Sequence, residues 1–311
     1  HKVLHAALSL KSGRNKVIAE ADCFPSDLYV LEGVKSLRPD LEILLEGRDG
    51  SSIHEMLDEQ VAAVLINHVD YRSGTIRDME NLTRQVQEFG GLTVWDLSHS
   101  AGIFPVQLNR CRVDFAVGCT YKYLNGGPGA PAYLYAASRH HTACNQPLSG
   151  WFGHARPFDF ERHFDPDSGI RRFVCGTQPI LSLRALQSGL EIYQDVSLQQ
   201  VREKSMALTD LFIKLLKNEC AAWELEIISP EDASQRGSQV AVSHPEGYAV
   251  MQALISRGVI GDFRAPNLMR FGFAPLFLSY QDIHDAVKQL KQILESEEWN
   301  QEAFLQKSKV T

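Results

Sequence analysis

Two polar residues that follow apolar runs, Asp96 and Lys122, are the strongest candidates for chemistry in this sequence. Asp96 lies in the run LTVWDL, and Lys122 comes 26 residues later, shortly after VDFAVG. A carboxylate can keep a pyridine nitrogen protonated, and a lysine amine can form a Schiff base with an aldehyde. Alone, such an Asp is more often a helix cap and such a Lys is more often solvated. Together they are the two protein groups that pyridoxal phosphate requires.

Short apolar runs alternate with helical patterns, and this alternation is expected to position the two residues. The strand-like runs cover residues 16–20, 41–45, 61–67, 92–97 and 113–118, and helical patterns at 52–59 and 78–90 lie between them. Alternating strands and helices predict βαβ units, hence an α/β fold with a mostly parallel sheet. Ligands bind at the carboxyl ends of such strands. Asn67 and His99 also follow apolar runs, so we expect them at the same edge.

The pattern changes near residue 180. Long helices are predicted at 180–196 and 197–220, and shorter ones from about residue 248 and after residue 279. Strands are predicted at 224–228, 238–244, 258–262 and 268–273. We therefore predict a large cofactor-binding domain over residues 1–190 and a small C-terminal α+β domain over residues 191–311.

Composition narrows the class of protein. The net charge is −7, which argues against binding to duplex DNA or to an anionic membrane surface. The six cysteines form no CxxC pair, so neither a metal cluster nor a disulfide framework is indicated, and a reducing cytoplasm fits best. No apolar run is long enough to span a bilayer. The chain starts as a helix already under way and without a methionine, so we expect an N-terminal part to be missing.

Five motifs resemble one enzyme family. The segments WDLSHSAG, GCTYKYLNGGPG, PLSGWFGH, CGTQPI and MRFGFAPLF are similar to those of kynureninase, in its bacterial form. The resemblance runs from FPSDLY to the C-terminal helices. It implies the aspartate-aminotransferase-like fold of type I pyridoxal-phosphate enzymes, and an N-terminal segment with further phosphate contacts that this chain does not contain.

The resemblance implies a set of cofactor-binding residues. Lys122 would carry the Schiff base and move protons, Asp96 would pair with the pyridinium nitrogen, and His99 would line the site. In the FPSD segment, Phe24 would stack on the ring and Asp27 would lie at its polar edge, with Pro25 and Ser26 between them. Read without the family, this segment is a helix start capped by Asp27, and His99 is equally well a structural hydrogen-bond donor.

Three further cofactor contacts follow from the resemblance. Asn67 stands where relatives are expected to have Ser or Thr. Trp151 and Thr177 match phosphate ligands that the family supplies from a neighbouring subunit, which implies a homodimer. Without the family, Trp151 reads as a half-buried aromatic residue and Thr177 as a turn residue.

Two residues are assigned to the substrate. Arg270 would clamp its α-carboxylate, because a planar guanidinium binds carboxylates in bidentate fashion, although an ion pair within the protein is an alternative. Tyr121 would act as the acid at the γ-carbonyl. The implied reaction is hydrolytic Cβ–Cγ cleavage of L-kynurenine to anthranilate and L-alanine, a step of tryptophan catabolism and of NAD biosynthesis. Acceptance of 3-hydroxykynurenine is left open.

Two alternatives stay open. A cysteine desulfurase or lyase of the same superfamily shares the Asp, the Lys and the Gly-Thr turn, but it needs a mobile nucleophilic cysteine. Cys175 lies in a motif expected to hold phosphate and Cys220 lies inside a predicted helix, so neither suits that role. The other alternative is a catalytically incomplete fragment that serves as a binding or assembly partner.

Overall fold

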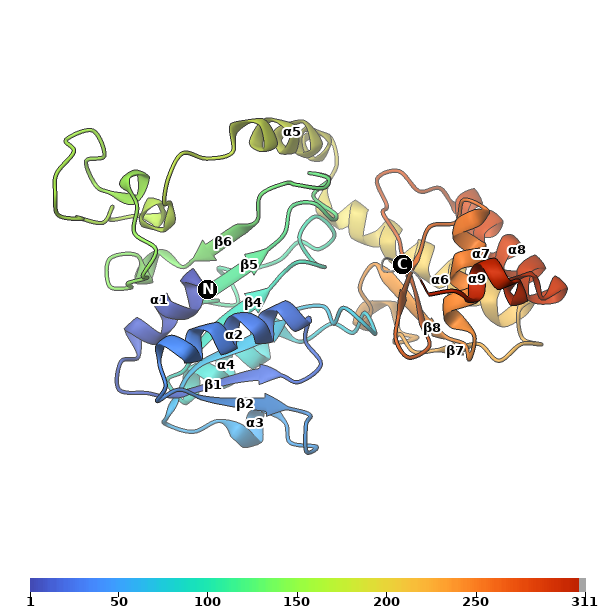
Figure 1. Cartoon of the computed structure of the whole chain (residues 1–311), viewed down its shortest axis with the longest axis horizontal. Helices are drawn as coiled ribbons and strands as arrows, with labels where there is room; N and C mark the ends of the chain where they lie inside the picture. Colours follow the sequence, from blue (N-terminus) through green and yellow to red (C-terminus); the bar gives the residue numbers. More distant parts are fainter. Residues whose placement is uncertain (308–311) are drawn as a thin grey trace. The chain divides into compact units, whose positions relative to one another are not determined.

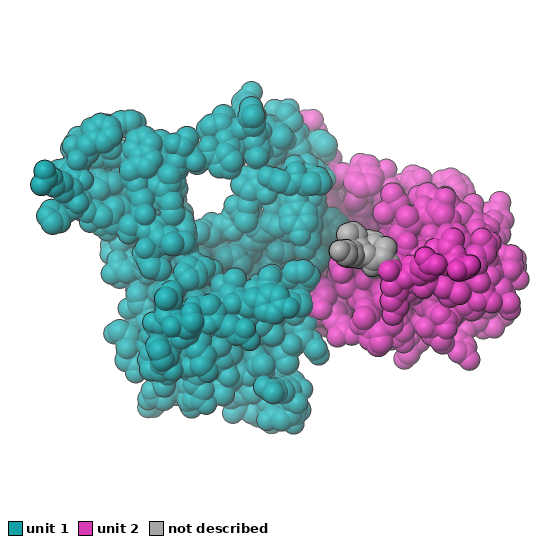
Figure 2. Space-filling model, viewed as in Figure 1, with its two compact units in different colours: residues 1–68, 77–101, 106–192 teal, residues 69–76, 102–105, 193–311 magenta. Residues whose placement is uncertain are grey.

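The computed structural model describes residues 1–307 as two compact units. Unit 1 comprises residues 1–68, 77–101 and 106–192, and unit 2 comprises residues 69–76, 102–105 and 193–311 (Figure 2). Two short segments of the N-terminal half therefore belong to unit 2. Segments that leave a unit and return to it depend on tertiary contacts, so a single boundary read along the sequence could not include them.

Unit 1 is built on a six-stranded sheet with strand order β2-β1-β3-β4-β5-β6. The strands are β1 (Lys16–Glu20), β2 (Glu42–Glu46), β3 (Val61–Asn67), β4 (Leu92–Asp96), β5 (Phe115–Gly118) and β6 (Tyr133–Ala136). All neighbours pair in parallel except β6, which is antiparallel to β5. The predicted α/β class is confirmed. The sequence reading missed β6, a four-residue edge strand within the apolar run AYLYAA.

Helices cover both faces of this sheet. Helices α1 (Lys2–Leu10) and α2 (Pro25–Leu37) pack with strand residues into one apolar cluster, and α3 (Ile53–Met56) and α4 (Met79–Glu88) contribute to a second (Figure 1). Strand β3 is buried over its whole length. Because both faces are covered, the carboxyl ends of the strands are the place where polar side chains can meet a ligand.

A buried carboxylate, Asp114, ties together the amino ends of β4 and β5. Its Oδ2 accepts hydrogen bonds from the backbone N–H of Thr93 and the side-chain amide of Gln87, both at 3.0 Å, and its Oδ1 lies 2.8 Å from Nε2 of His140. Burial alone would raise the pKa of Asp114, but these bonds outweigh it and lower the pKa to about 2. Asp114 thus stays ionised and helps to hold the two strands that lead to Asp96 and Lys122.

Much of the last part of unit 1, residues 146–192, projects from the sheet (Figure 1), but Phe173 within it packs into the apolar cluster of α1 and α2. It contains helix α5 (Ile180–Glu191), in which Leu186 is the one buried residue. Several of its large apolar side chains are open to solvent, including Leu181 at 87%, Phe160 at 78% and Phe158 at 69% exposure. Large apolar side chains exposed in one segment are unusual on the surface of a single chain. We call residues 146–192 the arm.

Unit 2 has a four-stranded antiparallel sheet in the order β7-β8-β10-β9. Its strands are β7 (Glu226–Ile227), β8 (Gln239–Ser243), β9 (Asp262–Arg264) and β10 (Leu268–Gly272). Its helices are α6 (Leu198–Glu219), α7 (Gly247–Ser256), α8 (Tyr280–Ser296) and α9 (Glu302–Leu305). Residues of α6, α7 and α8 pack against the sheet in one apolar core.

The strand predicted at residues 258–262 is wrong. Gly258 has φ +84°, and Val259 N donates to Leu254 O at 3.0 Å, so these residues close the carboxyl end of α7. The strand begins only at Asp262. Short apolar runs of this kind are compatible with a helix cap as well as with a strand, and the hydrogen bonds decide between them.

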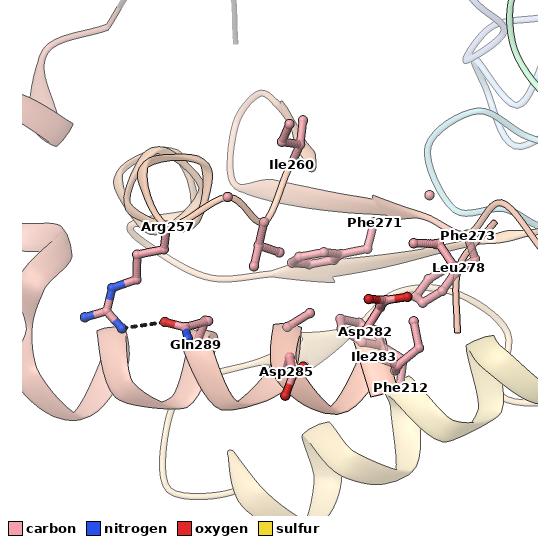
Figure 3. Close-up of a pocket in the computed structure, with 14 residues that line it drawn as sticks. Phe212, Arg257, Ile260, Phe271, Phe273, Leu278, Asp282, Ile283, Asp285 and Gln289 are labelled. Atoms are coloured by element: carbon pink, nitrogen blue, oxygen red, sulfur yellow. Dashed lines mark hydrogen bonds between the residues drawn. The ribbon is translucent and has the colours of Figure 1, made fainter. Parts of the chain in front are cut away.

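A cavity of about 370 Å³ lies in unit 2 between α8 and the sheet (Figure 3). Its floor is apolar and includes Phe212, Phe271 and Phe273. The polar groups at its rim already have partners: Asp282 accepts from the backbone N–H of Ser279 at 2.7 Å, and Arg257 donates to Gln289 at 2.9 Å. These polar groups therefore serve the folding of unit 2.

Within residues 1–307, no helix combines the length and the apolar character needed to cross a membrane.

Candidate cofactor site

Polar residues end four neighbouring strands of unit 1. Glu46 ends β2, Glu20 ends β1, Asn67 ends β3 and Asp96 ends β4. Glu20 pairs with Glu46, and Asn67 pairs with Asp96 in the parallel register. The sheet therefore presents a row of three carboxylates and one amide along its carboxyl edge. We call these residues the strand-end row.

A cavity of about 690 Å³ opens at this edge, entirely within unit 1. It brings together eight of the predicted cofactor or catalytic residues: Phe24, Ser26, Asp27, Asn67, Asp96, His99, Tyr121 and Lys122. Pro25 lies between two of them and begins α2. The predicted residues thus lie around one cavity, although they come from four separate stretches of the chain.

Lys122 follows β5 and stands at the cavity wall. Its Nζ is 3.2 Å from Nε2 of His99 and 5.6 Å from the centre of the Tyr121 ring. The loop behind it is closed by a 2.9 Å hydrogen bond from Gly126 N to Thr120 O, and Gly127 and Gly129 have φ of +70° and +85°. Glycine adopts these left-handed conformations without steric cost, so the loop can turn directly after the lysine.

Asp96 is a buried carboxylate at the end of β4, with 9% of its surface exposed. Its Oδ1 accepts a 2.7 Å hydrogen bond from the backbone N–H of Ser98, which orients the side chain. Its own backbone O accepts from His68 N at 3.0 Å. A fixed, buried carboxylate suits the role of a partner for a protonated pyridine nitrogen.

Asp27 is not the helix cap that the segment suggests when it is read without the family. Helix α2 begins at Pro25, its N-cap is Phe24 without a side-chain capping bond, and Asp27 lies in the first turn. Its Oδ2 is buried and has no hydrogen-bond partner within residues 1–307. Burial, reinforced by the negative charges of Asp96 and Glu20, raises the pKa of Asp27 to about 7. Near neutral pH this group can thus either accept or donate a hydrogen bond.

The structure adds two residues that sequence reasoning missed. Glu20 accepts hydrogen bonds from Asn67 N at 2.9 Å and from Asn67 Nδ2 at 3.1 Å. Tyr133 lines the cavity, and its buried hydroxyl has no partner in the described part of the chain. It reaches over Gly118, where a Cβ would lie only 2.3 Å from the hydroxyl oxygen. Glu20 carried the same strand-end signal as Asp96, but Tyr133 carried none, because β6 itself was missed.

Besides Pro25, three predicted residues are absent from the cavity lining within residues 1–307: Trp151, Thr177 and Arg270. Trp151 and Thr177 lie on the arm and are exposed. Arg270 lies in unit 2, where its Nε donates to Oδ1 of Asp262 at 2.8 Å and its Nη2 to Oδ2 at 2.5 Å. This ion pair occupies the Nε–Nη2 edge of the guanidinium, and Nη1 donates to the backbone O of Tyr71.

The residues around the cavity fit pyridoxal phosphate. Lys122 offers an amine for the aldehyde, Asp96 and Asp27 offer carboxyl groups for the pyridine nitrogen edge, and Phe24 offers a 42% exposed aromatic face. The unpartnered, buried Oδ2 of Asp27 is the clearest sign that this edge of the site is shaped for a polar ligand group. Fold and site together define a pyridoxal-phosphate-dependent enzyme of fold type I.

Solved structures of this class share the fold. The chain superposes on an apo cysteine desulfurase from Thermococcus onnurineus NA1 with TM-score 0.75 and 18% identity, covering 91% of this chain and 73% of that one. It superposes on a C-DES variant, with glycine covalently linked to its pyridoxal-phosphate cofactor, with TM-score 0.76 and 15% identity, covering 89% and 74%. At such identities the likeness shows the fold alone.

Sequence relatives specify the family. A kynureninase of Burkholderia mallei is 46% identical over 96% of this chain and 72% of its own length, and one of Pseudomonas fluorescens is 44% identical over 100% and 76%. Residues 201–290 match the family model of the kynureninase C-terminal domain. The chain belongs to the kynureninase family, which makes it a pyridoxal-phosphate-dependent hydrolase, and the resemblance seen in the motifs is confirmed.

The raised pKa of Asp27 predicts a pH-dependent loss in the free energy of unfolding of the cofactor-free protein. Folding disfavours the charged carboxylate, so the loss starts as pH rises above 3.8 and is complete above about 7. It amounts to about 4 kcal/mol at most, at 1.36 kcal/mol per pKa unit. Asp27→Asn should therefore raise the melting temperature more at pH 8 than at pH 5, whereas Asn at the exposed Asp22 should not. Equal stabilisation at both pH values would contradict this cause.

Proposed function

We propose that the cavity of unit 1 holds pyridoxal phosphate on Lys122 and catalyses hydrolytic Cβ–Cγ cleavage of L-kynurenine to anthranilate and L-alanine. The observation that carries this proposal is the meeting of Lys122, Asp96 and Tyr121 at one cavity in a member of the kynureninase family. When bound, the cofactor supplies an electron sink for charge developing at the substrate. The protein residues bind, orient and move protons.

Lys122 and its neighbours are arranged for proton transfer. The 3.2 Å separation of Lys122 Nζ and His99 Nε2 is a hydrogen-bond distance, so the imidazole can hold the amine in place or accept a proton from it. The Tyr121 side chain is 50% exposed and stands beside the lysine. We assign to its phenol the role of donating a proton to the substrate's γ-carbonyl oxygen as negative charge develops there.

The covalent role of Lys122 gives a direct test. We expect Lys122→Ala to abolish anthranilate release and to leave no cofactor attached to the chain after borohydride reduction, as measured by mass spectrometry. Tyr121→Phe should keep the attachment but lower kcat by about 100-fold or more, the usual contribution of a positioned acid. Cofactor still trapped on the chain without Lys122 would reject the assignment.

The same assay separates the alternatives. Alanine formed from L-cysteine, with sulfide released once a thiol reductant is added, would indicate a desulfurase, and cofactor binding without anthranilate or alanine would indicate a non-catalytic partner. The desulfurase reading is disfavoured at Cys220, because burial raises the pKa of this thiol to about 11 and the nucleophilic thiolate is then scarce. Cys220 also follows directly on α6 and is 1% exposed.

Arg270 is proposed to bind the substrate α-carboxylate. Support comes from its guanidinium, which Asp262 holds by Nε and Nη2 while Nη1 donates to the backbone O of Tyr71. These bonds pre-orient the guanidinium, and because each terminal nitrogen carries two N–H groups, Nη1 and Nη2 each keep one donor for an end-on carboxylate.

Arg270→Lys should raise KM for L-kynurenine, because an ammonium keeps the charge but cannot form the bidentate pair. The expected increase is about tenfold or more, equivalent to one lost charge-assisted hydrogen bond. Steady-state kinetics with L-kynurenine and with its α-carboxamide provide the measurement. The difference between the two substrates should shrink in the variant; an unchanged difference would place the carboxylate elsewhere.

We also propose that the enzyme is a homodimer in which the arm meets a second copy of the chain. The exposed apolar side chains of the arm support this, as do Trp151 and Phe158, whose rings meet edge to face at 5.8 Å on its surface. Trp151 and Thr177 would then reach the phosphate of the partner's cofactor.

We further assign the enzyme to the cytoplasm. Its six cysteines form no disulfide, which supports this assignment, and cell fractionation tests it.

Leu181→Asp should weaken the dimer, because it places a charge at an apolar side chain that is 87% exposed in the single chain. Sedimentation velocity over a dilution series should show monomers at concentrations where the unmodified protein is dimeric, with loss of bound cofactor in parallel. Ile260→Asp, at an 84% exposed position in unit 2, serves as the matched control. A monomeric unmodified protein that retains its cofactor would refute the shared site.

A further inference from the structure

Glu20 stands directly behind the cofactor cavity and contacts Asn67, which lines it. One oxygen of Glu20, Oε2, accepts both the backbone N–H of Asn67 at 2.9 Å and its side-chain Nδ2 at 3.1 Å. Both residues are buried, with 9% and 3% of their surface exposed. Such buried bonds are well shielded from water, so they restrict the side chain more than a surface contact would.

The second oxygen of Glu20 is held from the other side. Arg77 places Nη2 at 2.9 Å from Glu20 Oε1 and at 2.7 Å from Glu46 Oε2, so that it bridges the outer two carboxylates of the strand-end row. Burial raises the pKa of Glu20, and the Arg77 charge and the Asn67 bonds act against this rise. Glu20 thus has a fixed position between one cation and one amide.

We propose that Glu20 is a positioning residue that locks the Asn67 amide in a single orientation at the ring end of the cofactor cavity. A carboxylate only accepts hydrogen bonds, so the NH₂ group of Asn67 must face Glu20 and its carbonyl oxygen must point elsewhere. A neutral residue that both donates and accepts would permit the amide to turn over. Glu20 therefore determines which end of the Asn67 amide faces it, and the Asn67 side chain also hydrogen-bonds to Asp27 on the cavity side.

The inference rests on the proposed function, because it assigns Asn67 to the cofactor site. It adds a residue to which neither the motifs nor the strand-end argument gave a role. Its consequence is that cofactor affinity depends on Glu20, although this side chain does not line the cavity.

The strand-end row provides a matched pair of variants. Glu20→Gln and Glu46→Gln each remove one negative charge beside Arg77, but only Glu20 contacts Asn67. Cofactor affinity is measured by titrating the apoprotein with pyridoxal phosphate and following the absorbance of the bound cofactor. Glu20→Gln should weaken binding by about tenfold, a size typical for the loss of a supporting hydrogen-bond partner behind a ligand-holding side chain. Glu46→Gln should stay within about twofold of the unmodified protein.

A double-mutant cycle separates positioning from a general loss of structure. In an Asn67→Ala background, Glu20→Gln should have no further effect on affinity, because the group it orients is gone. Equal effects of Glu20→Gln in both backgrounds, or equal losses in Glu20→Gln and Glu46→Gln, would overturn the proposal. Failure of the proposed function would give a different result: borohydride reduction of the unmodified protein would leave no cofactor attached to Lys122.

Discussion

The site depends on one constraint, the parallel pairing of the first five strands of unit 1. Parallel strands end at the same edge, so residues far apart in sequence become neighbours once the register is set. Asn67 lies beside Asp96 for this reason, and the loop that carries Lys122 leaves the same edge from β5. Antiparallel β6 then closes the sheet and brings Tyr133 to the cavity wall.

Acidic side chains are concentrated at this edge, and their charge is neutralised by a cation at one part of it. Arg77 neutralises the outer part of the strand-end row by ion pairs with Glu20 and Glu46. At the inner part, the pKa of Asp27 is raised to about 7 by burial and by its acidic neighbours. A positively charged pyridine nitrogen would relieve this repulsion, so cofactor binding and charge balance are coupled.

The two units carry different parts of the proposed reaction. Unit 1 contains the cofactor cavity and the arm, and unit 2 contains Arg270, held by Asp262 across two neighbouring strands. The exposed apolar groups of the arm, such as Leu181, have no cover within unit 1 that would explain their type. The proposed homodimer would cover these groups and would bring Trp151 and Thr177 to the cofactor of the second copy.

The sequence by itself determined the class of fold and the strands that carry Asn67 and Asp96, and it predicted Lys122 as the Schiff-base lysine, because apolar periodicity and local motifs are properties of neighbouring residues. Only the tertiary structure decided which strand ends meet, that Asp27 is a buried first-turn acid with its pKa raised to about 7, and that Glu20 faces Asn67. It also showed that Gly258 and Val259 close the end of α7, that the next strand begins only at Asp262, and that β6 completes the sheet. These features depend on burial and on contacts between distant segments, which no local pattern records.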